Sequence, residues 1–277
     1  MIRSCLTLLC ILVALPALAQ ERRPSHCIAI ADADPALSYV HRASFGTPLP
    51  DAYSVRLNYV DHATFVIETA GGLTAATDFT GFLGTTGLIP DVVTMNNAHH
   101  THFTAFPDPS IPYVLQGWAD SEGKAADHYL DLGEMLVRNV PTDVRGYDRN
   151  VVRENGNSIF VFEVAGLCIG HLGHLHHAPD DNQYASLGRL DVVMAPVDGG
   201  LTLDLPTMIG VLERLKSSIV IPMHWFGDYS LDRFLTGIGE EFEVRRPGES
   251  HLEVSLKTLP ERPTVIVLEP AHLHDPE

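Results

Sequence analysis

Short, mainly hydrophobic runs that are typical of β-strands alternate along this chain with polar segments. Between Ser54 and Phe79, the runs "SVRLNYV", "TFVIETA" and "LTAATDF" are separated by polar or Gly-Gly turns, which predicts a sheet built from hairpins. Further strands are predicted at "DVVTMNN", "EMLVRNV", "NSIFVFEV", "GLCIGHL", "DVVMAPV", "SIVIPMHWF", "HLEVSLK" and "TVIVLEP".

One segment between these runs, "LDLPTMIGVLERLK", has the spacing of an amphipathic helix instead. Its apolar residues recur every three or four positions, at Leu205, Met208, Ile209, Leu212 and Leu215. Asp204 precedes this stripe and is suited to cap the helix. Strands first and α/β alternation afterwards favour layered sheets flanked by helices. Since no repeat or linker interrupts the pattern, we expect one domain over residues 20–277.

The first twenty residues, "MIRSCLTLLCILVALPALAQ", have the pattern of a cleaved secretory signal. A basic residue precedes an apolar stretch, which ends at the small-x-small triplet Ala17-Leu18-Ala19. We therefore expect residues 1–19 to be removed. The mature protein, from Gln20 on, is expected to be periplasmic or secreted, without a membrane or lipid anchor.

Only two cysteines, Cys27 and Cys168, follow this segment. In an oxidising compartment they could form a disulfide. Cys168 lies in the apolar run "GLCIGHL", and is equally well explained as a small buried hydrophobic residue. The sequence leaves both interpretations open.

The charge balance narrows the range of partners. The chain has 18 Lys and Arg against 35 Asp and Glu, a formal net charge of −17. An acidic surface repels polyanions, so nucleic acid is disfavoured as a partner and a small-molecule substrate is favoured. The oligomeric state does not follow from these numbers.

Histidines gather in three short windows, each directly after a predicted strand. The windows contain His99, His100 and His102, then His171, His174, His176 and His177, and finally His224. A single histidine is more often a surface or hydrogen-bonded core residue than a ligand. However, loops at one end of a sheet can converge, and imidazole is the commonest metal ligand in proteins. Three such windows therefore favour a metal site.

Several sequence blocks, taken in order, resemble the metallo-β-lactamase superfamily, in the branch of sugar-phosphate lactonases and related metal-dependent hydrolases. They are "NYVDHATFVIET", "TDFTG", "PDVVTMNNAHHTHF", "NGNSIFVFEVAGLCIGHLGHLHH", "DVVMAPVDGG" and "IVIPMHWF". The resemblance extends from about Ser54 to Phe226. It implies an α+β fold, a four-layer αββα sandwich, with a metal site at one edge between the two sheets.

The metal motif of this family is altered here. The family pattern His-x-His-x-Asp-His falls on Asn97, His99, Thr101 and His102. An amide therefore replaces the first histidine, and a hydroxyl replaces the aspartate. The family block "HLGDLGH" falls on "HLGHLHH", so His174 stands where the family has its metal-bridging aspartate.

The resemblance leaves His99, His102 and His224 as metal ligands, with His174 as a substituted fourth. A histidine cannot bridge two cations as a carboxylate does, so we expect one divalent ion, and the imidazole ligands favour zinc. Three protein ligands would leave a position for water, which ionises to hydroxide near neutral pH, whereas four would close the site.

Other family positions suggest supporting roles. Asp143, in the region of a missing family histidine, and His177 are candidates for proton transfer, although Asp143 is equally well explained as a turn residue. His62 matches a family position near the metal, but it could also be a hydrogen-bonded histidine at a hairpin. The residues expected to surround the ligands are Asn97, Thr101, His62, Asp78 and His171.

The sequence thus predicts an exported hydrolase that cleaves a small ester, lactone or amide with a metal-bound hydroxide. The alternative is a non-catalytic metal-binding or metal-sensing protein on the same fold, with a closed ligand shell. A nuclease is disfavoured, because the chain is acidic and lacks a basic stripe.

Overall fold

Two β-sheets form the body of the protein in the computed structural model, which describes residues 23–28, 47–146 and 152–275. The expected signal segment, residues 1–19, lies outside the described residues. The first sheet has the strand order β14-β1-β2-β3-β5-β6. Its strands are β1 (Val55–Asp61), β2 (Thr64–Thr69), β3 (Thr74–Ala76), β5 (Val92–Met95), β6 (Tyr113–Gln116) and β14 (His251–Val254).

The second sheet has the strand order β13-β15-β12-β11-β10-β9-β8-β7. Its strands are β7 (Tyr129–Asp131), β8 (Met135–Arg145), β9 (Val152–Val164), β10 (Leu167–His171), β11 (Val192–Pro196), β12 (Ile219–Met223), β13 (Glu243–Arg245) and β15 (Thr264–Ile266). A small parallel pair is formed by β4 (Gly84–Thr85) and β16 (Leu273–His274). The helices are α1 (Asp181–Leu187), α2 (Leu205–Leu215), α3 (Asp228–Gly237) and a 3-10 turn, η1 (Gly239–Glu241).

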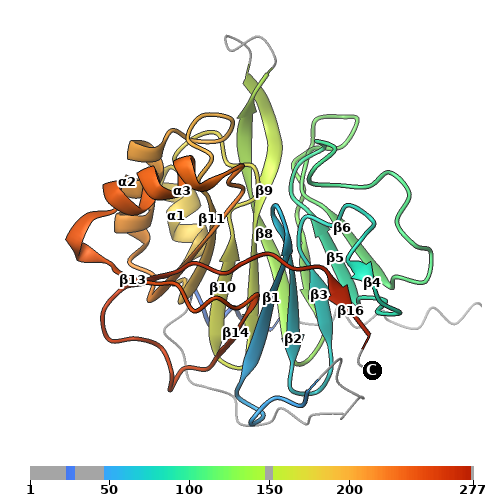
Figure 1. Cartoon of the computed structure of the whole chain (residues 1–277). Helices are drawn as coiled ribbons and strands as arrows, with labels where there is room; N and C mark the ends of the chain where they lie inside the picture. Colours follow the sequence, from blue (N-terminus) through green and yellow to red (C-terminus); the bar gives the residue numbers. More distant parts are fainter. Residues whose placement is uncertain (1–22, 29–46, 147–151, 276–277) are drawn as a thin grey trace, which may run out of the picture.

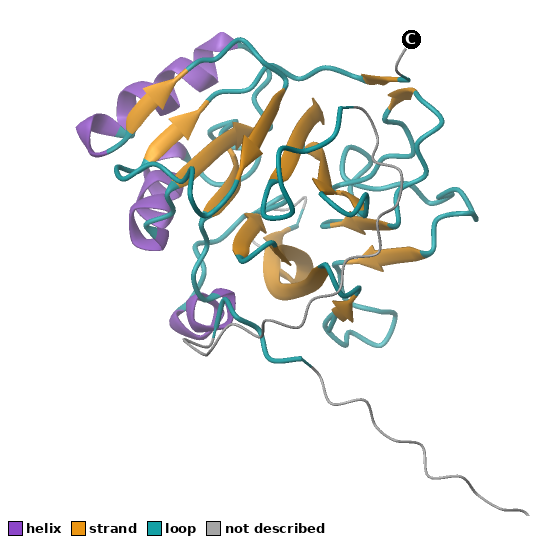
Figure 2. Ribbon diagram, turned by 90° about the horizontal axis from the view of Figure 1, so that it is seen from below, coloured by secondary structure: helices purple, strands orange, loops and turns teal. Residues whose placement is uncertain are grey.

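The two sheets pack face to face over a shared apolar core. Leu57 and Phe65 from the first sheet and Phe162 from the second are fully buried in it. The helices cover the outer face of the second sheet, where Met208 and Phe234 are buried. Figure 1 shows α1, α2 and α3 together on one side of the molecule, and Figure 2 shows the same layer from below. The expected α+β sandwich is confirmed.

The outer face of the first sheet differs from the expected helical layer. In the part of the chain that the structure describes, loops and the β4–β16 pair cover this face (Figure 1). Phe103 and Trp118 from these loops pack against a buried cluster that includes Val66 and Met95. Glycine and proline recur between residues 81 and 112, and both destabilise helices.

The predicted helix is confirmed as α2. The Asp204 side chain caps it by accepting a hydrogen bond from the Thr207 N–H at 3.0 Å, and Met208 and Leu212 face the core. The short helices α1 and α3 were not predicted from the sequence. None of the helices in the described residues is long and apolar enough to cross a bilayer.

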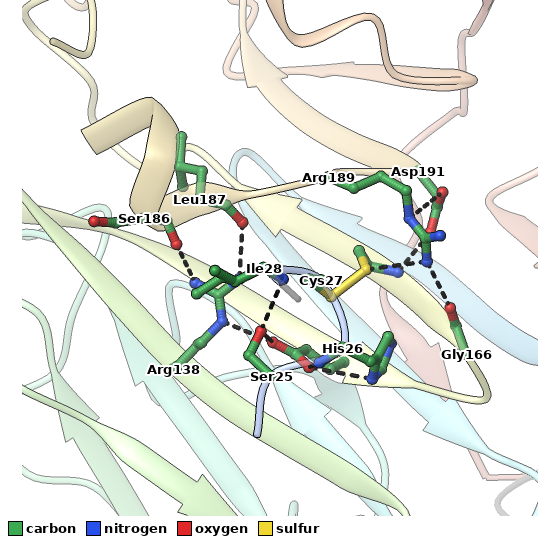
Figure 3. Close-up of a disulfide and its surroundings, with 12 residues drawn as sticks. Ser25, His26, Cys27, Ile28, Arg138, Gly166, Ser186, Leu187, Arg189 and Asp191 are labelled. Atoms are coloured by element: carbon green, nitrogen blue, oxygen red, sulfur yellow. Dashed lines mark hydrogen bonds and ion pairs between the residues drawn. A yellow bond between two sulfur atoms is a disulfide. The ribbon is translucent and has the colours of Figure 1, made fainter. Parts of the chain in front are cut away.

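A disulfide joins Cys27 to Cys168, so the pairing that the sequence left open does occur. It ties the segment 23–28 to strand β10 (Figure 3). The backbone N–H of His26 also donates to the Glu163 carboxylate at 3.0 Å. Arg138 forms a buried ion pair with the same carboxylate at 2.7 Å, so the attachment continues into β8 and β9.

We expect replacement of both Cys27 and Cys168 by serine to lower the free energy of unfolding by about 2–4 kcal/mol, because the bridge closes a long loop in the unfolded chain. Urea denaturation of residues 20–277, with and without a thiol reductant, measures this. The reductant should destabilise the unsubstituted protein and leave the double variant unaffected. Equal stability of all four samples would contradict a formed disulfide.

Candidate metal centre

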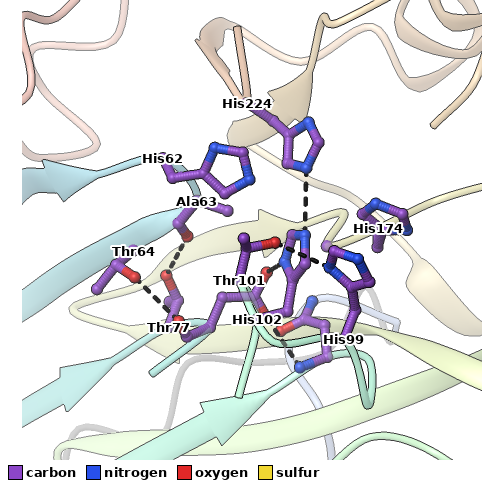
Figure 4. Close-up of polar contacts among 12 residues, drawn as sticks. His62, Ala63, Thr64, Thr77, His99, Thr101, His102, His174 and His224 are labelled. Carbon is purple, nitrogen blue, oxygen red and sulfur yellow. Dashed lines mark hydrogen bonds and ion pairs between the residues drawn. The ribbon is translucent and has the colours of Figure 1, made fainter. Parts of the chain in front are cut away.

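In the described part of the chain, a cluster of histidines forms where the ends of the two sheets meet. His62 comes from the turn between β1 and β2. The other members of the cluster follow three strands: His99 and His102 follow β5, His174 and His176 follow β10, and His224 follows β12. Figure 4 shows the rings of His62, His99, His102, His174 and His224 gathered around a common space. Residues from both sheets therefore build one site.

The spacing of the rings suits a metal ion. His102 Nε2 lies 3.2 Å from His224 Nε2, close to the separation of about 3.3 Å expected for two nitrogens on one tetrahedral zinc. Two groups of three histidines have their nitrogen ligand atoms within 4.8 Å of one another. One group is His62, His102 and His224, and the other is His99, His102 and His174.

A buried carboxylate orients His102. The ring is fully buried, and its Nδ1 lies 2.6 Å from Asp78 Oδ2. The other carboxylate oxygen accepts the Asn96 N–H at 2.7 Å. Burial raises the pKa of Asp78 to about 7, a shift that a nearby cation would oppose. With Nδ1 donating to the carboxylate, Nε2 of His102 presents a lone pair to the cluster.

His224 is oriented in the same way by Asp198. Its Nδ1 lies 3.0 Å from Asp198 Oδ2. The Asp198 carboxylate also accepts the backbone N–H groups of Gly200, Leu201 and Thr202. Although burial alone would raise the pKa of Asp198, the hydrogen bonds from His224 and Thr202 hold it far below its usual range. Asp198 therefore stays ionised, and Nε2 of His224 also presents a lone pair.

The lone pairs of His102 Nε2 and His224 Nε2 face each other, an arrangement that suits a metal ion. Two unprotonated nitrogens at 3.2 Å cannot hydrogen-bond to one another. A cation between them would satisfy both, and the carboxylates behind the rings have the role that outer carboxylates have at metal centres. The arrangement of His102 and His224 therefore fits a divalent cation.

The backbone is strained at this site. His62, Asp78 and His224 have positive φ angles of 43°, 41° and 57°. Residues other than glycine rarely adopt this left-handed region, and such strain persists where surrounding contacts enforce it. Here the enforcing contact is partly internal, because the His224 N–H donates to the His62 carbonyl at 2.8 Å.

Burial keeps most of the cluster neutral at pH 7, the form in which imidazole binds metals. Desolvation lowers the pKa of His62 to about 3 and that of His176 to about 4. It also lowers the pKa values of His99, His102 and His174.

Three residues expected near the ligands have defined contacts. His171 is buried, and both of its ring nitrogens are used: Nε2 faces the Ala63 carbonyl at 2.7 Å and Nδ1 accepts the Gly173 N–H at 3.2 Å. Thr101 Oγ1 lies 3.0 Å from His99 Nδ1. The Asn97 amide oxygen accepts a hydrogen bond from Arg153 at 3.3 Å. His171 therefore supports the site structurally, without a free nitrogen for a metal.

Asp143 and His177, the candidates for proton transfer, lie outside the group of contacting histidine rings. Asp143 accepts the Asn155 N–H at 2.8 Å within the β8–β9 hairpin, and His177 is exposed. In the described residues, neither one takes part in the contacts that link the clustered rings. Their catalytic roles stay predictions.

Asp198 is a site residue that was not predicted from the sequence, and His176, although it lies in one of the histidine windows, was given no role. Asp198 directly follows the predicted strand "DVVMAPV", and that position was the available signal. His176 Nε2 lies 2.8 Å from His174 Nδ1, a contact that residue spacing alone does not predict.

Comparison with known proteins identifies relatives of this chain. The sequence model of the beta-lactamase superfamily domain matches residues 56–224. A UPF0173 metal-dependent hydrolase of Nanoarchaeum equitans is 25% identical over 188 residues, which cover 62% of this chain and 84% of the relative.

Solved structures share the same fold. One is a protein of Thermotoga maritima described as a Zn-dependent hydrolase of the metallo-β-lactamase superfamily. It has a TM-score of 0.53 at 23% identity, over 78% of this chain and 99% of that chain. Igni18, a metallo hydrolase of Ignicoccus hospitalis, has a TM-score of 0.52 at 18% identity, over 73% of this chain and 99% of that chain.

We expect the metal-free protein to lose stability as the pH falls from about 7.5 to about 5.5. The lowered pKa values of the buried histidines mean that the unfolded chain binds more protons than the folded chain below about pH 6.5. Asp78 and Asp191, whose pKa values burial raises, act in the opposite direction. The melting temperature in EDTA should fall by several degrees over this range. A constant or rising melting temperature would show that the rings are not buried as neutral groups.

We expect Asp198→Asn to weaken the binding of a divalent cation, with zinc as the probe, about 10- to 100-fold, because it removes the negative charge that orients and polarises His224. Titration against a chromophoric chelator measures the affinity. Asp204→Asn is the matched control, since Asp204 caps α2 and an asparagine also serves as an N-cap. Equal affinities of the two variants would remove Asp198 from the site.

Proposed function

The chain belongs to the metallo-β-lactamase superfamily, and from that premise we propose that it is a metal-dependent hydrolase with a single divalent cation. The imidazole ligands favour zinc. The proposed substrate is a small molecule with an ester, lactone or amide bond. The similarity to the Nanoarchaeum equitans metal-dependent hydrolase supports the reaction class.

The observation that carries this proposal is the pair of facing nitrogens of His102 and His224, 3.2 Å apart. Each ring is fixed by a carboxylate on its far side, Asp78 for His102 and Asp198 for His224. Such a pair is costly to bury unless a cation lies between the nitrogens. The site is therefore organised for metal binding before any substrate arrives.

The side chains around the cluster support one ion rather than two. Where the family has a bridging aspartate, this chain has His174, which cannot bridge. Asn97 and Thr101 replace two further family ligands, and both are engaged with neighbours: Asn97 with Arg153, and Thr101 with His99. A second ion would therefore lack the carboxylate that separates two cations in two-metal sites.

When bound, a divalent cation polarises the scissile carbonyl and lowers the pKa of a water molecule. The chain's own contribution is to hold the cation through His102 and His224 and to supply compensating charge through Asp78 and Asp198. Phe226 stands beside this group, with its ring centroid 5.2 Å from that of His62 and 5.3 Å from that of His224. The Phe226 residue is 67% exposed, so it offers an apolar wall to a substrate entering from solvent.

We also propose that the protein is exported. The signal-like pattern of residues 1–19 supports this. The Cys27–Cys168 disulfide supports it independently, because disulfides persist mainly in oxidising compartments.

The number of histidines favours one alternative, a non-catalytic metal-binding protein. The two groups of three histidines together offer more imidazoles than a tetrahedral ion needs. If four of them bound the same ion, no position would remain for water or substrate. Metal content and turnover therefore have to be measured on the same sample.

We expect residues 20–277, purified without chelator, to contain about one zinc per chain and to hydrolyse members of a panel of nitrophenyl esters, lactones and anilides. His102→Ala should lose both zinc and turnover, because it removes a nitrogen common to both histidine groups. His251→Ala, which changes an exposed histidine on β14, is the control.

Elemental analysis and initial rates distinguish the hydrolase from the non-catalytic metal-binding protein. Two ions per chain would contradict the single-ion site. One tightly bound ion without turnover on any substrate would favour the non-catalytic alternative. Absence of metal would contradict both.

A further inference from the structure

We propose that the clustered histidines have two distinct roles: His62, His102 and His224 bind the cation, whereas His174 is no ligand and presents an N–H donor to an oxygen atom of the substrate. This inference rests on the proposed function only in requiring one cation in the cluster. It changes the expectations from the family resemblance at three residues, because the resemblance placed His99 and His174 among the ligands and His62 behind them. The hydrogen bonds that already engage the ring nitrogens distinguish the two roles.

The direction of the hydrogen bonds at His174 is set from outside the cluster. The backbone N–H of Arg145 donates to His176 Nδ1 at 2.8 Å. A backbone N–H can only donate, so a neutral His176 has its proton on Nε2. That nitrogen lies 2.8 Å from His174 Nδ1 and donates to it.

His174 therefore has its own proton on Nε2 when it is neutral. A ring nitrogen that bears a proton cannot bind a metal, and Nδ1 already accepts the hydrogen bond from His176. The His174 backbone is held as well, because its N–H donates to Asn157 Oδ1 at 3.0 Å. In this arrangement His174 supplies an N–H to the site and no lone pair.

His102 and His224 have the opposite arrangement. Their Nδ1 atoms donate to Asp78 and Asp198, so their Nε2 atoms carry lone pairs. The hydrogen-bond partner of Nδ1 therefore decides the role of each ring. Where Nδ1 donates to a carboxylate, Nε2 has a lone pair and can bind a metal; where Nδ1 accepts an N–H, Nε2 bears the proton and can only donate.

His62 provides a third nitrogen for the ligand group. Among the described residues, its Nε2 atom is buried and has no hydrogen-bond partner. The His62 ring centroid lies 4.0 Å from that of His224 and 5.5 Å from that of His102. A buried unpartnered nitrogen is costly, and a cation shared with the other two rings would satisfy it.

The backbone fixes His62 relative to His224. The His62 carbonyl accepts hydrogen bonds from the His224 N–H and from the Tyr59 hydroxyl, both at 2.8 Å. His62 and His224 each have a left-handed backbone, and the hydrogen bond between them links the two turns. Figure 4 shows His62 and His174 on opposite sides of His102, and each belongs to a different one of the two histidine groups.

The test compares His62→Asn with His174→Asn. Asparagine tolerates the left-handed backbone at position 62, so the substitution does not add strain there. The readouts are zinc affinity, from competition with a chromophoric chelator, and the visible spectrum of the cobalt(II)-loaded protein, which reports the ligand set. Thermal unfolding in EDTA checks that each variant is folded, and His251→Ala is the control.

We expect His62→Asn to weaken zinc binding more than about 100-fold, beyond the loss typical of an outer-shell change, and to alter the cobalt spectrum. His174→Asn should weaken binding less than about 10-fold and keep the spectrum. An equal loss in both variants, a loss only in His174→Asn, or no loss in either would overturn the assignment while leaving the single-ion hydrolase intact. No zinc binding by the unsubstituted protein would overturn both.

Discussion

The hydrogen bond between a histidine ring and a buried carboxylate is the interaction on which this site depends. Asp78 follows β3 in the first sheet and binds His102, while Asp198 follows β11 in the second sheet and binds His224. A buried carboxylate is tolerated only when its oxygens are hydrogen-bonded, and both aspartates also accept backbone N–H groups. Each pair thus anchors a ring to the framework and fixes which nitrogen faces the centre.

The sequence predicted much of the framework, because the framework follows from local patterns. Short apolar runs bounded by turn residues identified the main strands, and the spacing of Met208 and Leu212 identified α2 with its cap. The histidine windows were also placed correctly at strand ends. The three windows come together because of the topology of the sheets. The loops that follow β5, β10 and β12 all lie where the two sheets meet.

The remaining features depend on contacts between residues that are far apart in the chain. The pairing of Asp198 with His224 spans 26 positions, and that of Cys27 with Cys168 spans 141. The orientation of His174 depends on a backbone N–H at Arg145, donated through His176. Residue types alone do not reveal such directions, because either ring nitrogen of a histidine can donate or accept. The sequence therefore located the candidate ligands but could not separate ligands from donors.

Charge supports the proposal of a single ion in the altered motif. In the described residues, the carboxylates bonded to the clustered rings are Asp78 and Asp198, and their two negative charges balance one divalent cation. A second cation about 3.5–4 Å away would add a repulsion on the order of 20 kcal/mol at an effective dielectric constant of about 20. The family's aspartates would offset that repulsion, but Thr101 and His174 carry no charge to replace them. The proposed single ion would leave the centre neutral, and a neutral centre costs less to bury at the edge between two sheets than a charged one.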